Sequence, residues 1–89
     1  MKITILIPVF NEKNYILKVL EKVNIQKKKY DLEIIVVDDH SIDGTVELLK
    51  NNNHLYDKIF YKNKNDGKGS AIIEGIKLAT GEYTLVQDA

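Results

Sequence analysis

The stretch LEIIVVDDHS, residues 32–41, decides the fold class of this chain. Its apolar part, Leu32 to Val37, is a continuous run that predicts a strand buried on both faces, and the acidic pair Asp38-Asp39 ends it. A second run of this kind, Lys2 to Val9, lies nearer the start and is rich in β-branched residues. Strands with two apolar faces are typical of a parallel sheet that helices cover on both sides.

The segments around these strands change their hydrophobic period, which predicts the rest of the fold. From Glu12 to about Gln26, apolar residues recur at helical spacing. The remaining expected elements are a short helix over Thr45 to Lys50, a strand over Lys58 to Tyr61, a helix over Lys68 to Ala79 and a strand over Glu82 to Gln87. Strands that alternate with helices predict an α/β fold, a Rossmann-like parallel sheet of about four strands with right-handed helical crossovers.

Three residues predict where the helices begin and end. Asn11 is expected to cap the N-terminus of the first helix, because its side-chain oxygen can accept a hydrogen bond from a free backbone amide. Asp43 is expected to do the same for the second helix. Gly81 stands where the C-terminal glycine cap of the third helix belongs.

Length and composition indicate one small globular domain. The chain has 89 residues, 44% of them hydrophobic, and its 13 basic and 13 acidic residues give a formal net charge of zero. Every basic residue is a lysine and no basic face is evident, so we do not expect nucleic-acid binding. The absence of cysteine excludes a disulfide framework and a cysteine-ligated metal site.

The apolar segments are short. None approaches the ~20 residues that a membrane-spanning helix needs. The N-terminal run resembles a signal peptide only superficially, because Pro8 interrupts it and charged residues follow without a cleavage site. We therefore expect a mature, soluble, cytoplasmic chain, and membrane association stays an open question for a longer parent protein.

Four carboxylates follow strands of the expected sheet: Glu12, Asp38, Asp39 and Asp88. Ligands of open parallel sheets bind at the carboxyl ends of the strands, so we expect these side chains on one rim. An acidic rim repels a bare phosphate. Either a divalent cation, Mg²⁺ or Mn²⁺, lies between carboxylate and phosphate, or some carboxylates accept hydrogen bonds from a base or a ribose, and both arrangements can hold together.

The loop Asn65 to Ser70 does not match the known phosphate-binding motifs. In a phosphate loop a serine or threonine would follow Lys68, where this chain has Gly69, and Lys62 takes the position of the first glycine. Ile72 likewise takes the third glycine position of the dinucleotide-binding fingerprint. What remains is a flexible turn with one lysine at a helix N-terminus, which is either an anion site or a plain turn.

Several motifs together resemble family 2 glycosyltransferases of the GT-A fold. They occur in the family's order and cover essentially the whole chain: residues 7–12 (IPVFNE), 33–45 (EIIVVDDHSIDGT), 65–71 (NDGKGSA), 79–83 (ATGEY) and 87–89 (QDA). Each piece alone is modest, but the combination is specific. The Gly-Lys-Gly turn and the QDA sequence look most like the branch that makes polyprenyl- or dolichyl-phosphate sugars.

The resemblance implies a site for a nucleotide-diphosphate sugar. Glu12 and the acidic pair are compatible with a uridine or guanosine donor, UDP- or GDP-linked, because a carboxylate can accept a hydrogen bond from the ring N–H of either. Asp88 matches the first acid of the family's Asp-x-Asp motif, which carries Mg²⁺ or Mn²⁺ against the donor's diphosphate. The other positions implied to contact the nucleotide are Pro8, Phe10, Glu12, Val37, Asp38, Asp39, Lys68 and Ala89. An acceptor, which is a lipid phosphate in the nearest branch and otherwise a glycan or a protein, would attack the sugar with inversion. No residue of the chain matches a catalytic base.

The chain also departs from the family's pattern. Phe10 stands where tyrosine is usual, His40 where glycine is frequent and Ile42 where threonine is frequent. The motif's second acid would be residue 90, so we expect residues 1–89 to be the nucleotide-sugar-binding half of a glycosyltransferase domain, inactive alone. Two alternatives stay open, a non-catalytic nucleotide-sugar-binding remnant and, more remotely, a receiver-like signalling domain that accepts phosphate on Asp88.

Overall fold

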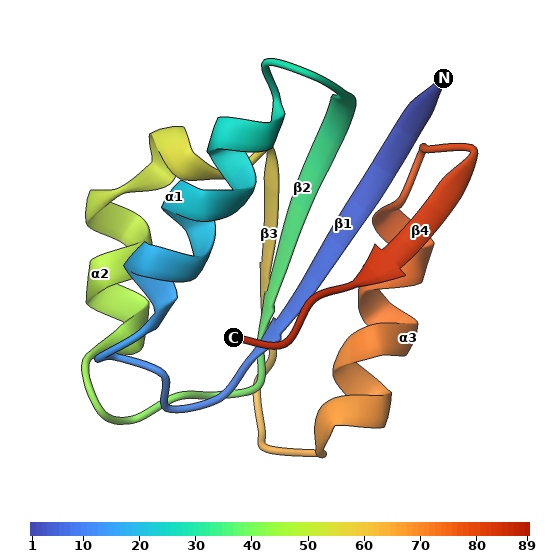
Figure 1. Ribbon diagram of the computed structural model, residues 1–89. Coiled ribbons are helices and arrows are strands. Elements are labelled where there is room, and N and C mark those ends of the chain that lie inside the picture. The colour runs from blue at the N-terminus through green and yellow to red at the C-terminus, as the bar shows by residue number, and fades with distance from the viewer.

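Four parallel strands form one sheet in the order β3-β2-β1-β4 (Figure 1). The computed structural model describes all residues, 1–89. The strands are β1 (Lys2–Val9), β2 (Asp31–Asp38), β3 (Lys58–Tyr61) and β4 (Tyr83–Val86). Chain order and strand order together place β4 beside β1, on the side away from β2 and β3. The order of strands therefore reverses at β1, and the carboxyl ends of β1 and β4 form the edge where open α/β sheets bind ligands.

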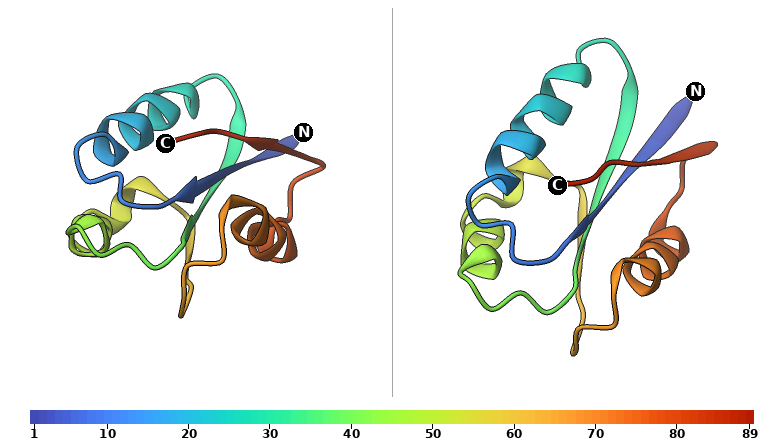
Figure 2. Two further views of the ribbon diagram at one scale, coloured as in Figure 1. Left: turned by 90° about the horizontal axis from the view of Figure 1, so that it is seen from below. Right: turned by 60° about the horizontal axis from the view of Figure 1, so that its bottom comes forward.

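Helices cover both faces of the sheet (Figure 2). The helical elements are α1 (Ile16–Gln26), α2 (Thr45–Asn51), the short 3₁₀-helix η1 (Asn53–Leu55) and α3 (Lys68–Leu78). The helices α1 and α2 lie on one face of the sheet, and α3 lies on the other. The predicted α/β class and the alternating order of elements are confirmed, and η1 is an addition that the hydrophobic pattern did not indicate. None of the helices has both the length and the apolarity needed to cross a bilayer.

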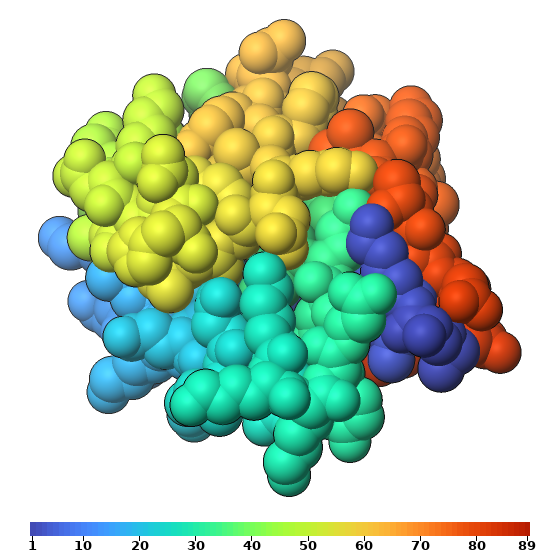
Figure 3. Space-filling view, turned by 90° about the horizontal axis from the view of Figure 1, so that it is seen from above, coloured from blue at the N-terminus to red at the C-terminus, as the bar shows by residue number.

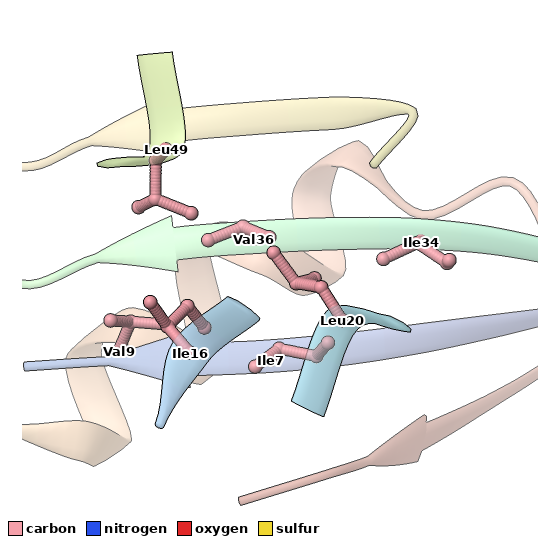
Figure 4. Packing of buried hydrophobic residues seen from close by; sticks show 7 residues of the cluster. All are labelled: Ile7, Val9, Ile16, Leu20, Ile34, Val36 and Leu49. Atoms are coloured by element: carbon pink, nitrogen blue, oxygen red, sulfur yellow. The ribbon is translucent and has the colours of Figure 1, made fainter. Parts of the chain in front are cut away.

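The core follows from the two-residue alternation along β1 and β2. One set of side chains packs against α1 and α2 (Figure 4): Ile7, Val9, Ile34 and Val36 from the strands, with Ile16, Leu20 and Leu49 from the helices. The alternate residues Ile35 and Val37 pack with Ala71 of α3 on the other face. Each such side chain contributes about 1.5–3 kcal/mol when it is fully buried, so both faces of β2 stabilise the fold.

The prediction that Asn11 caps the first helix is wrong. The helix α1 begins at Ile16, its N-cap residue is Tyr15, and no side chain caps it. Asn11 has a positive φ of 51° instead, and its Oδ1 accepts a hydrogen bond from the amide of Ile42 at 2.9 Å. The side chain is therefore engaged by a neighbouring loop rather than by the helix that follows it.

The other two predicted caps differ from expectation in smaller ways. Gly44 is the N-cap residue of α2, and Asp43 accepts a hydrogen bond from the amide of Thr45 at 3.0 Å from one position earlier. The helix α3 ends at Leu78, before Gly81, which has no positive φ. A Cβ atom at Gly81 would lie 2.6 Å from the backbone nitrogen of Thr4, so close packing against β1 is what requires glycine there.

A buried carboxylate, Glu33 of β2, ties together the end of the sheet that lies opposite the carboxyl ends. Its Oε1 accepts hydrogen bonds from Thr4 Oγ1 at 2.8 Å and the Thr80 amide at 2.9 Å, and its Oε2 lies 2.9 Å from Lys58 Nζ. Burial would raise the pKa of Glu33, but these hydrogen bonds outweigh it and lower the pKa to about 2. Figure 3 views this end, where the N-terminal residues lie between β2 and the segment that leads into β4.

Candidate functional site

Two loops at the carboxyl ends of β1 and β2 are joined by hydrogen bonds. The amide of Asn11 donates to Ser41 Oγ at 2.8 Å, and Asn11 Oδ1 accepts from the Ile42 amide. His40 has a positive φ of 66°, which explains why glycine is frequent there in the resembling family. These contacts hold the backbone that follows the acidic pair against the loop after β1.

A second set of contacts extends this junction to α2. The amide of Glu12 donates to Thr45 Oγ1 at 3.1 Å, and the amide of Lys13 donates to Asp43 Oδ2 at 3.3 Å. Burial would raise the pKa of the Asp43 carboxyl, but hydrogen bonds from Thr45 and Lys13 lower it below its ordinary range. The first turn of α2 therefore orients the segment that carries Glu12.

The two members of the acidic pair have different surroundings. Asp38 is buried, and its carboxylate accepts hydrogen bonds from the amide of Ser41 at 2.9 Å and from its hydroxyl at 2.6 Å. It belongs to the α1 and α2 side of the sheet and shapes the turn. Val37 lies in the core under α3. The structure therefore places these two predicted site residues behind the surface of the candidate site.

Asp39 holds the loop that leads into α3. Its Oδ1 accepts a hydrogen bond from the Asp66 amide at 3.1 Å, and its Oδ2 accepts one from the Gly67 amide at 2.9 Å. The ammonium of Lys62 lies 3.7 Å from Asp39 Oδ1. The charge of Asp39 is thus largely compensated by protein groups, although the residue borders the candidate site.

Lys62 lies beside the candidate site, and the sequence analysis did not identify it. It is 7% exposed, and its Nζ donates to Asp66 Oδ2 at 3.0 Å and to the hydroxyl of Ser70. The hydrogen bond from Lys62 lowers the pKa of Asp66. Its position directly after β3, at the same sheet edge as the acidic pair, was the signal that could have identified it.

A pocket of about 280 Å³ opens at the carboxyl ends of β1 and β4. Its lining comes from the β1 and β2 loops, the start of α3 and the segment after β4: Pro8, Val9, Phe10, Glu12, Asp39, Lys68, Ala71, Asp88 and Ala89. Seven of the nine residues predicted for the nucleotide site are in this set, and Val37 and Asp38 are not. Figure 1 shows the last residues crossing in front of β1 towards this edge.

Lys68 provides the positive charge of the pocket. It is the first residue of α3, and its Nζ donates to Asp88 Oδ1 across the pocket. The amides of residues 68–70 precede the first helical hydrogen bond, which runs from Ala71 N to Gly67 O, so they have no partner within the helix. The start of α3 therefore presents both an ammonium and free amides to an anion.

The donor set of the pocket consists of oxygen ligands. No three His, Cys, Asp or Glu side chains lie close enough together to hold a metal ion by themselves. Mg²⁺ commonly takes only one or two protein carboxylates and completes its shell with phosphate oxygens and water. Asp88, whose side chain is 73% exposed, fits that role if a ligand supplies the remaining oxygens.

A larger and more apolar groove of about 640 Å³ lies elsewhere, between α1 and strands β1 and β4. Its lining is mostly hydrophobic and contains no carboxylate: Ile3, Ile5, Val19, Lys22, Val23, Gln26, Tyr30, Leu32, Leu85 and Gln87. Size alone favours this groove, but the charged groups and free amides gather in the smaller pocket. The smaller pocket is therefore the candidate site.

Comparison with known proteins identifies the family of this chain. The family model described as glycosyl transferase family 2 matches residues 4–89, so the chain belongs to that family. A dolichol-phosphate mannosyltransferase of Pyrococcus furiosus is 33% identical over the whole chain. The chain spans 26% of the length of that relative. Membership of this family contradicts the receiver-like alternative.

Solved structures share the same fold. A mannosyltransferase from Pyrobaculum calidifontis in complex with GDP-Man and Mn²⁺ superimposes with a TM-score of 0.82 at 29% identity, over 97% of this chain and 26% of that one. Residues 1–349 of S. aureus TarS in complex with UDP-GlcNAc give a TM-score of 0.85 at 28% identity, over 99% of this chain and 26% of that one. These neighbours confirm the predicted GT-A fold.

Proposed function

We propose that residues 1–89 form the nucleotide-sugar-binding part of an inverting, metal-dependent glycosyltransferase domain that reaches the first acid of its Asp-x-Asp motif at Asp88. The observation that carries the proposal is the 280 Å³ pocket at the strand-order reversal, with its exposed acid, its lysine and its helix N-terminus. The relatives support a nucleotide-sugar donor, since one neighbour is a complex with GDP-Man and another with UDP-GlcNAc. We therefore expect a donor linked to UDP or GDP.

Each lining residue has a role that its chemistry supports. Phe10, which is 40% exposed, and Pro8 offer an apolar surface to the base. Glu12 has no side-chain partner within the protein and can accept hydrogen bonds from a ring N–H or a ribose hydroxyl. Lys68 and the free amides of α3 suit the diphosphate. Asp88 would hold Mg²⁺ or Mn²⁺, which supplies charge stabilisation at the leaving diphosphate.

The proposal names a class of acceptor and assigns no catalytic base. The similarity to a dolichol-phosphate mannosyltransferase favours a lipid phosphate over a glycan or a protein. The chain holds no residue that we assign as a base, so we expect no sugar transfer by the 89-residue chain alone. A cytoplasmic location, and membrane association of a longer parent protein, stay predictions.

The proposal is tested by adding UDP or GDP, with and without Mg²⁺, to the ¹⁵N-labelled chain. We expect amide shifts at Phe10, Glu12, Asp39 and the start of α3, and no shifts near Glu33 at the other end of the sheet. In Asp88→Asn the nucleotide should still bind, but added Mg²⁺ should no longer strengthen binding. Saturating nucleotide and Mg²⁺ that leave Glu12 and Asp39 unchanged would show that the site is assigned wrongly.

A further inference from the structure

Lys68 and Asp88 form the one ion pair that crosses the candidate pocket. They are 20 residues apart in the sequence and come from different elements, the start of α3 and the segment after β4. Neither side chain has another hydrogen-bond partner within the protein. Both side chains are exposed, 56% for Lys68 and 73% for Asp88. Such exposed pairs contribute little to stability, so this contact can be exchanged for another at small cost.

Asp39, another acid of the pocket, is in a different state from Asp88. The carboxylate of Asp39 is held by the amides of Asp66 and Gly67 and lies beside the buried ammonium of Lys62. Moving Asp39 would release that loop, whereas Asp88 holds nothing but Lys68. The Lys68–Asp88 pair is therefore the pocket's exchangeable pair of charges.

The position of Lys68 favours an anionic partner. The N-terminus of a helix carries a partial positive charge, so a lysine at the first helical residue is repelled unless an anion lies nearby. Asp88 supplies that anion in this structure. The side chain of Lys68 is 56% exposed, so solvent rather than protein surrounds most of it and it has room to move.

We propose that Lys68 is a positioning residue that neutralises Asp88 in the empty pocket and transfers to the diphosphate when a divalent cation takes its place on Asp88. The inference rests on the proposed function, because it assumes that a nucleotide diphosphate and a cation use this pocket. The ammonium and the cation compete for the same carboxylate, and the diphosphate replaces Asp88 as the anion at the start of α3. The lysine thus favours the nucleotide and disfavours the metal alone.

This competition predicts effects of opposite sign. Lys68→Gln should bind Mn²⁺ alone about two- to five-fold more tightly than the native chain, the range expected for losing an exposed ion pair. The same variant should bind UDP or GDP without metal several-fold more weakly. Asp88→Asn should reverse both effects, losing Mn²⁺ binding and binding metal-free nucleotide more tightly, because Lys68 is no longer paired.

The experiment measures Mn²⁺ binding by water-proton relaxation and UDP and GDP binding by amide shifts, on the native chain and both variants. Lys64→Gln is the matched control, since Lys64 is 81% exposed in the same loop and does not line the pocket. It should leave both affinities unchanged, and circular dichroism should report the same fold for all proteins.

The outcomes separate this inference from the proposed function. Opposite shifts in Lys68→Gln support the transfer of Lys68 from Asp88 to the diphosphate. Shifts in the same direction, no shift, or equal shifts in Lys64→Gln overturn it while nucleotide binding by the native chain leaves the proposed function standing. A native chain that binds neither UDP nor GDP overturns the proposed function and this inference with it.

Discussion

An almost fully buried carboxylate keeps its charge in this protein because both of its oxygens have donors. Glu33 is 4% exposed and accepts hydrogen bonds from Thr4, Thr80 and Lys58. Lys2 Nζ also lies 3.6 Å from Glu33 Oε2. Removing one partner would leave a buried polar group without compensation, which is why such networks are sensitive to single substitutions. The network joins β1, β2, β3 and the segment between α3 and β4.

The network predicts a specific loss of stability in acid. The pKa of Glu33 is about 2 in the folded chain and 4.5 ordinarily. Its contribution, about 3 kcal/mol, is therefore present above pH 4.5 and disappears as the pH falls from 4.5 towards 2. We expect urea unfolding at pH 6 and pH 3 to show a larger loss for the native chain than for Glu33→Gln, by about 2 kcal/mol.

The control for this measurement is Glu21→Gln, at an exposed acid of α1 that has no hydrogen-bond or ion-pair partner. It should lose stability between the two pH values as the native chain does. An equal loss in the native chain and in Glu33→Gln would mean that Glu33 does not hold a depressed pKa.

The alternation of side chains along a strand explains which of the predicted residues line the pocket. The rule that ligands bind at carboxyl ends of strands placed Glu12, Asp39 and Asp88 at one pocket. It could not separate Asp38 from Asp39. Side chains alternate along a strand, so Asp38, still within β2, belongs to the face opposite α3, whereas Asp39 lies beyond the strand end.

At the scale of elements, α3 packs against the sheet closely enough to require a glycine. A Cβ atom added to Gly75, in the middle of this helix, would lie 2.5 Å from Cδ1 and 2.6 Å from Cγ of the fully buried Leu6. Glycine in a helix interior costs about 1 kcal/mol relative to alanine. The close approach of α3 to β1 is therefore maintained against the intrinsic preference of the helix.

Two glycines of α3 should respond oppositely to the same substitution. Gly75→Ala should lower the free energy of unfolding by about 1–2 kcal/mol, because overpacking against Leu6 exceeds the gain in helix propensity. Gly69→Ala, with no atom within 4 Å of the added methyl group, should raise it by up to about 1 kcal/mol. Chemical denaturation of both variants measures the difference, and a stabilised Gly75→Ala would contradict the packing argument.

The elements themselves were predictable because their signals are local. The continuous apolar runs of β1 and β2 and the helical spacing in α1 depend on residues a few positions apart. The starts and ends of helices were not predictable where a distant loop competes. Asn11 binds the amide of Ile42, 31 positions away, and Gly81 packs on Thr4, 77 positions away. No short window of sequence contains such a contact, and the same is true of the Glu33 network.

At the scale of the whole molecule, the two sides of the sheet are unevenly covered. The strand β4 is exposed along its length, and its Leu85, 56% exposed, borders the 640 Å³ groove beside α1. Pairing in register places Leu85 beside Ile5 and Thr84 beside Thr4, so these two residues of β4 lie on opposite faces. Exposed apolar surface of this kind promotes association in water.

We expect the purified chain to associate as its concentration rises and Leu85→Lys to reduce that association. The lysine places a charge in the apolar groove, whereas Thr84→Lys adds the same charge on the other face and should have a smaller effect. Sedimentation equilibrium across a concentration series measures both. If both lysines act equally, pairing through the strand edge rather than through the groove drives association.

The pairing of β4 with β1 also imposes a delay during synthesis. Ile3 lies beside Tyr83, 80 residues later in the chain, so β1 has to wait for β4 to be synthesised before the two strands can pair. At about 5–20 residues per second, the wait is roughly 4 to 16 seconds. During it, β1 can pair only with β2, and the edge that β4 will occupy stays open to chaperones and to other nascent chains.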